Sequence, residues 1–293
     1  MPALPKKILS VLAVVALLAA AIGVSRFDAE AYGRRFVELA QEQAQLTLRP
    51  QGAAHLRIFP YPAVVLGRGM LSGRGESATF DELRLNLGWW PLLSGKAALP
   101  GMVVRGLDVA GLLHLDEVQV RFDGNAVDIE GNGTGLGLAN LSVSLQSAPQ
   151  GDTRNLALAV RGQRGAEQFD LRLVADRLQL AQDRYAAEKV TLVAQFVRDG
   201  DSLDAVLSLP KVAGGYRAAQ ADGAALAVTH AWNNARLTAK YHGAATLDLA
   251  AGWLAWPAAR LAVELHEPGK AAVETNWHGA TRYTAAAFVG EKR

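Results

Sequence analysis

The residue types that most often perform chemistry are scattered through this 293-residue chain. Cysteine is absent, which excludes disulfides, thiolate nucleophiles and cysteine-bound metals. The histidines show no pair four residues apart and no carboxylate at zinc-ligand spacing, so we expect no metal site. They are His55, His114, His230, His242, His266 and His278. No serine has a Gly-x-Ser-x-Gly context. The sequence therefore predicts no catalytic residue, no cofactor and no enzyme activity.

A glycine-rich run, residues 131–137 (GNGTGLG), looks at first like a phosphate-binding loop. A leucine stands where the third glycine is required, and the run lies between expected strands instead of before a helix. We therefore expect a hairpin turn here. The charge balance excludes another class of ligand. The chain has 30 basic and 28 acidic residues and no basic cluster beyond short pairs, so we expect no nucleic-acid partner.

The N-terminus predicts a membrane anchor. Lys6 and Lys7 precede the continuous apolar run Ile8–Val24, which is at the short end of what crosses a bilayer. Lysines before such a run favour a cytoplasmic N-terminus and translocation of the remaining chain. Residues 1–25 are thus expected to be an uncleaved single-pass anchor. A cleaved signal peptide is the alternative, because Ala19–Ala21 offers small residues for cleavage.

An amphipathic helix is expected over residues 26–45, with Asp28 as its N-cap. After it the hydrophobic period changes to two, as in residues 82–87 (ELRLNL), where leucines alternate with polar residues. Similar short runs separated by Gly, Asn and Asp continue to the end, which predicts one β-domain over residues 46–293 with antiparallel pairing. Two segments are ambiguous: Arg177–Ala187 suits a loop or short helix, and Leu249–Trp256 a helical turn.

A long sheet with one apolar face must either fold on itself as a sandwich or curl into a trough that something else fills. From the residues alone, the sandwich is favoured as the commoner arrangement. The order of the N-terminal segments adds a further indication. After the anchor come a helix that contains Tyr32–Arg35, a short strand and a Phe-Pro strand. A leucine strand follows, then a Pro-Leu-Leu-Ser-Gly-Lys turn and a last strand. The five segments after the helix are, in order, Leu46–Leu48, Leu56–Val64, Phe80–Leu87, Pro91–Lys96 and Met102–Leu107.

In this order and spacing, the span from about Ile8 to Leu113 resembles the N-terminal part of the AsmA family of Gram-negative envelope proteins. The resemblance implies a long curved antiparallel β-sheet that forms an apolar groove, anchored in the inner membrane and projecting into the periplasm. It implies phospholipid as the partner and a role in outer-membrane assembly. Candidate groove-wall residues are Leu83, Leu85, Leu87, Val118, Val120, Phe122, Leu141, Val143 and Leu145. An ordinary closed core is the alternative for these side chains.

Two other expectations remain open at this point. Trp89 and Trp90 suit the membrane interface, where aromatic residues gather, and equally suit the base of the groove. The alternative function is a structural or assembly role, in which the sheet edge pairs with an envelope protein by strand addition. The type II secretion component N proteins, which share a single anchor and a β-rich periplasmic domain, exemplify that role.

Overall fold

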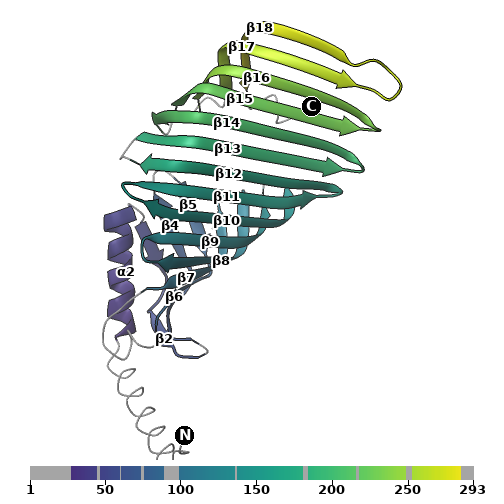
Figure 1. Cartoon of the computed structure of the whole chain (residues 1–293). Coiled ribbons are helices and arrows are strands. Elements are labelled where there is room, and N and C mark those ends of the chain that lie inside the picture. The colour runs from purple at the N-terminus through teal and green to yellow at the C-terminus, as the bar shows by residue number, and fades with distance from the viewer. Residues whose placement is uncertain are drawn as a thin grey trace, which may run out of the picture. The chain divides into compact units, whose positions relative to one another are not determined.

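The computed structural model is mainly β-structure with antiparallel strand pairing (Figure 1). It describes residues 28–44, 47–59, 61–73, 76–88, 99–135, 137–180, 184–215, 218–248 and 253–284. The chain forms two compact units. Unit 1 holds the described residues up to Asp123 together with residues 131–135, and unit 2 holds residues 124–130 and those from Gly137 onward. The sequence pattern predicts a single domain over residues 46–293.

The predicted anchor, Ile8–Val24, lies outside the described residues, as do Trp89 and Trp90. Across the described ranges, no helix combines the length and the apolar character that a membrane crossing requires.

Unit 1 begins with helix α2 (Ala29–Ala44). The Asp28 carboxylate accepts a hydrogen bond from the Ala31 backbone N–H at 2.9 Å, which confirms the predicted N-cap. Gly33 is buried against the sheet, and a Cβ at this position would lie 3.0 Å from the Ala54 Cβ and 3.2 Å from a Leu66 methyl group. The missing side chain therefore lets α2 pack closely on the sheet.

The strands of unit 1 form an antiparallel meander. Several of them are interrupted at the same level of the sheet, so each of these appears as two shorter strands. The strands are β1 (Thr47–Pro50), β2 (His55–Arg57), β3 (Ala63–Leu66), β4 (Gly69–Gly73), β5 (Glu76–Phe80), β6 (Glu82–Asn86), β7 (Gly101–Val109) and β8 (Leu113–Asp123). β3 and β4 pair with β2 and β1 on one side and with β6 and β5 on the other. β7 pairs with both β5 and β6 and then with β8.

The break in these strands is held by Arg68 and Asp81. Their side chains form an ion pair at 3.1 Å. The Arg68 carbonyl accepts from the Gln51 N–H at 2.7 Å, and the Asp81 N–H donates to the Arg105 carbonyl at 2.9 Å. Two backbone hydrogen bonds and one side-chain ion pair thus connect neighbouring strands at the break.

The hairpin-turn prediction for residues 131–137 was wrong for residues 131–135, which lie in a strand, whereas Gly137 is in the turn that precedes the next strand, as predicted. Strand β9 (Ala126–Gly135) contributes residues to both units. In its unit 1 part, a Cβ on Gly133 would lie 2.1 Å from the His114 carbonyl oxygen, whereas a Cβ on Gly131 would find its nearest neighbour at 3.4 Å. Gly133 therefore permits a backbone approach that any other residue would block.

Unit 2 is a curved antiparallel sheet in which the strands follow one another in chain order (Figure 1). Its strands are β10 (Leu138–Gln150), β11 (Thr153–Arg164), β12 (Glu167–Leu180), β13 (Arg184–Arg198), β14 (Asp201–Gly215), β15 (Ala218–Trp232), β16 (Ala235–Asp248), β17 (Trp253–His266) and β18 (Val273–Thr284). Tight turns join many of them. At Asp199-Gly200 and Asn233-Asn234 both turn residues have positive φ, the conformation that matches the twist of a two-residue hairpin.

The two ambiguous segments are strands wherever they are described. β12 continues through Arg177 to Leu180, β13 starts at Arg184, and β17 starts at Trp253. The helical alternatives for Arg177–Ala187 and for residues 253–256 were therefore wrong. A register shift between Val174 and Gln179 explains the misleading pattern, because a bulge disturbs the period-two alternation on which the strand prediction depends.

Candidate functional site

The apolar side chains of unit 2 line up across the sheet in rungs, each made of residues that face one another on adjacent strands. The first rung, called the leucine rung, crosses the sheet from β10 to β18. Its members are Leu145, Leu158, Leu173, Leu192, Leu207, Leu226, Tyr241, Leu261 and Trp277. Directly opposite residues point to the same side of an antiparallel sheet, so these side chains share one face.

Two further rungs extend this face away from the leucine rung. The second consists of Val143, Val160, Leu171, Ala194, Ala205, Val228, Ala239, Val263 and Thr275. The third consists of Gly162, Phe169, Phe196, Leu203, His230, Leu237, Leu265 and Val273. None of these residues is Asp, Glu, Lys or Arg. The three rungs together are called the apolar face.

The apolar face stays partly open to solvent. Members of the leucine rung on β10 to β17 are half-buried, and in the third rung Phe196 is 43% exposed and Leu203 is 37% exposed. The described part of unit 2 contains strands and turns, and none of its described residues forms a helix over the face. Contiguous exposed apolar area of this kind is unusual for a soluble surface and is typical of a binding surface.

The opposite face of the same strands is polar. Asp170 accepts hydrogen bonds from Arg172 at 2.9 Å and from Arg161 at 3.0 Å, and Gln195 donates to Asp204 at 2.7 Å. The hydrogen bond from Arg172, more than the charge of Arg161, holds the pKa of the Asp170 carboxyl below its usual value. The sheet is thus amphipathic: the Asp and Arg side chains of these strands lie on the side opposite the apolar face.

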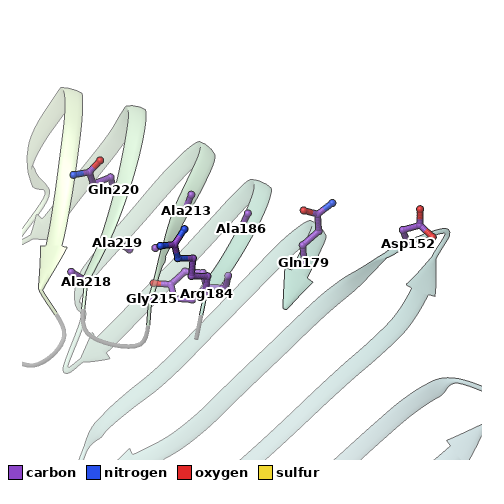
Figure 2. A pocket seen from close by; sticks show the side chains of 11 residues that line it. Asp152, Gln179, Arg184, Ala186, Ala213, Gly215, Ala218, Ala219 and Gln220 are labelled. Atoms are coloured by element: carbon purple, nitrogen blue, oxygen red, sulfur yellow. The ribbon is translucent and has the colours of Figure 1, made fainter. Parts of the chain in front are cut away.

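One end of the apolar face closes into a core. Register shifts occur at aligned places in β12, β15, β16 and β17, and Lys189 and Gly223 have positive φ along the same line. Beyond this bend line the strand ends curl over (Figure 2). Trp256 is fully buried there, among small residues such as Ala221 and Ala245, and leucine-rung members pack against the cluster. The sheet therefore curls toward its apolar face.

A broad depression of about 950 Å³ runs across the curled strand ends (Figure 2). Small residues form much of its lining, including Ala213, Gly214 and Ala219, and Arg184 supplies a positive charge. Tyr185 belongs both to this lining and to the residues packed against the core. Burial raises the pKa of the Tyr185 phenol, so its hydroxyl stays neutral at physiological pH. The lining also contains Asp152, Gln179 and Gln220, so polar side chains and small residues share this open depression.

Comparison of the chain with protein-family models, with curated proteins and with solved structures finds no match. The AsmA resemblance therefore stays a prediction.

Six of the predicted wall residues come together on one face of unit 1. Leu83 and Val118 both lie opposite Val104, and Leu85 and Val120 both lie opposite Met102. Leu87 and Phe122 are at the next level, where their N–H groups donate to the carbonyls of Pro62 and Pro100. Phe122 is half-buried and the other five are buried, with Leu85 having no exposed surface. A role in lipid contact for these six stays a prediction.

The other three predicted residues belong to unit 2. Val143 and Leu145 are half-buried members of the apolar face, and Leu141 precedes them on the same strand and is buried. Trp89 and Trp90 lie outside the described residues. Within the described residues, no three histidine or carboxylate side chains are arranged to hold a metal ion.

Sequence reasoning missed the greater part of the apolar face, from Leu158 to Trp277. A usable signal was present in the turns. Residues at equal sequence distances before and after a two-residue turn face each other. Leu192 and Leu207 are related in this way by the Asp199-Gly200 turn. Leu226 and Tyr241 are related in the same way by the Asn233-Asn234 turn. Turn position fixes register in a two-residue hairpin, so rungs can be built from hairpins alone.

Proposed function

We propose that this protein is an AsmA-type envelope protein, anchored in the inner membrane with its bulk in the periplasm. Its apolar face holds or transfers phospholipid and so supports outer-membrane biogenesis. The observation that carries the proposal is the set of three apolar rungs that cross unit 2, two from β10 and one from β11, to β18 and remain partly exposed. The family assignment rests on the resemblance of the N-terminal segments.

The physical basis is the hydrophobic effect. Moving one acyl CH₂ group out of water gains about 0.8 kcal/mol, so lipid chains need an apolar wall wherever they cross water. The rungs provide such a wall without an Asp, Glu, Lys or Arg side chain. A wall of uniform chemistry binds the chain at many equivalent places, which favours movement along the sheet over capture at one site.

The curl of the sheet supports the same function. Because the strand ends fold toward the apolar face at the bend line, acyl chains on the face are shielded on that side by the Trp256 core. The polar face keeps the outside of the sheet soluble through groups such as Asp170 and Arg172. Acyl chains therefore have one surface without Asp, Glu, Lys or Arg to occupy, whereas the opposite surface carries ion pairs.

Two residues of β14 give a matched test. Leu203 lies on the apolar face and is 37% exposed, and Val206 lies on the polar face and is 40% exposed. We expect Leu203→Asp to lower the amount of phospholipid that co-purifies with the full chain, measured by mass spectrometry, and Val206→Asp to leave it unchanged. Both variants keep the anchor, so lipid around the anchor cancels in the comparison.

Equal lipid in the two variants and the wild type would exclude the apolar face as the lipid site. In that case cross-linking from the face to a protein partner would support the alternative, a structural role in an envelope assembly.

A further inference from the structure

Three exposed large apolar side chains of unit 1 belong to one hairpin tip. β2 and β3 are joined through residues 58–62, where Ile58 is 43%, Phe59 83% and Tyr61 73% exposed. Arg57 donates a hydrogen bond from Nε to the Phe59 carbonyl at 3.1 Å, which ties the tip to the strand before it. These three side chains, Ile58, Phe59 and Tyr61, are called the apolar tip.

The apolar tip lies at the end of unit 1 where α2 begins. α2 ends at Ala44, close in sequence to the start of β1 at Thr47, and β1 and β2 run in one direction toward the tip. Gly33 packs beside Ala54, just before β2. The helix is therefore antiparallel to these strands, and its N-terminal end is on the side of the tip. Figure 1 shows α2 and β2.

The chain that precedes α2 therefore leaves unit 1 beside the apolar tip. Residues 1–27 contain the predicted membrane-spanning run Ile8–Val24. Few residues separate the end of that run from Asp28, so this end of unit 1 must stay within a short distance of the bilayer. Among possible partners, a lipid surface is the one that the chain itself brings to the tip.

We propose that the apolar tip inserts into the interface of the bilayer that holds the anchor. This inference rests on the proposed anchoring of residues 1–25 and adds a second contact that fixes the orientation of unit 1. Aromatic rings with a polar atom, such as that of Tyr61, favour the headgroup level, and Phe59 and Ile58 favour the acyl boundary. Arg57 can keep its charge among lipid phosphates while its stem stays apolar.

The absence of cysteine makes a direct test simple. A nitroxide is attached to Tyr61→Cys in the full chain, reconstituted in vesicles of phosphatidylethanolamine and phosphatidylglycerol. Its depth is read from collisions with oxygen and with a water-soluble nickel chelate. We expect the label to lie about 5–10 Å inside the lipid phosphates. Adding Phe59→Asp, at the most exposed of these positions, is expected to move the label into water.

Two controls make the result decisive. Leu112 is 64% exposed at the β7–β8 turn, at the opposite end of the same sheet, so a label on Leu112→Cys is expected to stay in water. A label on Val15→Cys reports the anchor. If the label on Val15→Cys lies inside the bilayer and the label on Tyr61→Cys lies in water, the inference is overturned and the proposed anchoring stays intact. Aqueous labels at both positions would overturn both.

Discussion

Tyr241 and Trp256 stack in unit 2, with ring centroids 5.8 Å apart and planes inclined by 28°. Tyr241 is a member of the leucine rung, and Trp256 lies at the bend line on the neighbouring strand. The pair therefore joins the open apolar face to the closed core, and it marks where the sheet starts to curl. Aromatic pairs in offset geometry add to the stability that their burial alone provides.

Replacing Trp256 by alanine is expected to weaken the curl. The indole is fully buried in the core cluster, so Trp256→Ala leaves a large cavity and lowers the free energy of unfolding by about 3–5 kcal/mol. Urea denaturation followed by circular dichroism measures the loss. Trp277→Ala is the control, because Trp277 is 41% exposed and should cost clearly less. Similar losses in both variants would contradict the role assigned to Trp256.

The close approach at Gly133 gives a second prediction. A Cβ there would overlap the His114 carbonyl oxygen, and backbone cannot move aside as a flexible side chain can. Gly133→Ala is therefore expected to destabilise unit 1 by about 1–3 kcal/mol. Gly131→Ala adds the same methyl group two residues away, where its nearest neighbour would be an ordinary contact at 3.4 Å. Urea denaturation should show a lower free energy of unfolding for Gly133→Ala. For Gly131→Ala the free energy of unfolding should stay within a few tenths of a kcal/mol of the wild-type value.

Lys189 provides a test of the bend line. Its φ of 50° is left-handed, a conformation that costs a non-glycine residue about 1–2 kcal/mol. Glycine removes that cost but loses more chain entropy, so Lys189→Gly should raise the free energy of unfolding slightly or leave it unchanged. Thr191→Gly, two residues along the same strand and without positive φ, should lower it by about 0.5–1 kcal/mol. A clear loss for Lys189→Gly would contradict strain at this position.

The Asp170 cluster predicts a pH dependence with a defined sign. The pKa of the Asp170 carboxyl is lowered in the folded state. The carboxylate therefore stabilises the fold at any pH above the pKa of an unfolded Asp, about 3.9. This contribution is lost as the pH falls through the lower pKa of the folded state. Asp170→Asn should therefore be less stable than wild type at pH 7, and the difference should vanish once the pH has fallen below the lowered folded-state pKa. Because Arg161 and Arg172 are more than half exposed, the gap at pH 7 should stay below about 1 kcal/mol.

Urea midpoints at pH 7 and at acidic pH check the Asp170 prediction. Added salt should narrow the gap at pH 7, since ions screen exposed pairs. A gap that is equal at both pH values would show that Asp170 acts through packing and not through its charge.

Local sequence patterns were enough to predict much of the fold. Asp28 was recognisable as an N-cap because a carboxylate before an apolar-periodic segment has one favourable partner, the unpaired N–H groups of the first turn. The alternation in residues 82–87 placed Leu83 and Leu85 on one face because the side-chain period of a strand is two. The same rule failed at Arg177, where a bulge shifts the register, and at Gly133, where a partner strand requires the glycine.

The amino-acid sequence by itself determined that this chain alternates apolar and polar residues in short runs between turn residues, and hence that it forms an amphipathic antiparallel sheet. The tertiary structure alone decided which apolar residues share a core and which stay open. Leu85 and Leu207 are both leucines in alternating strands, yet Leu85 is fully buried in unit 1 and Leu207 belongs to a partly exposed rung. Burial depends on what packs over a face, and distant segments supply that cover.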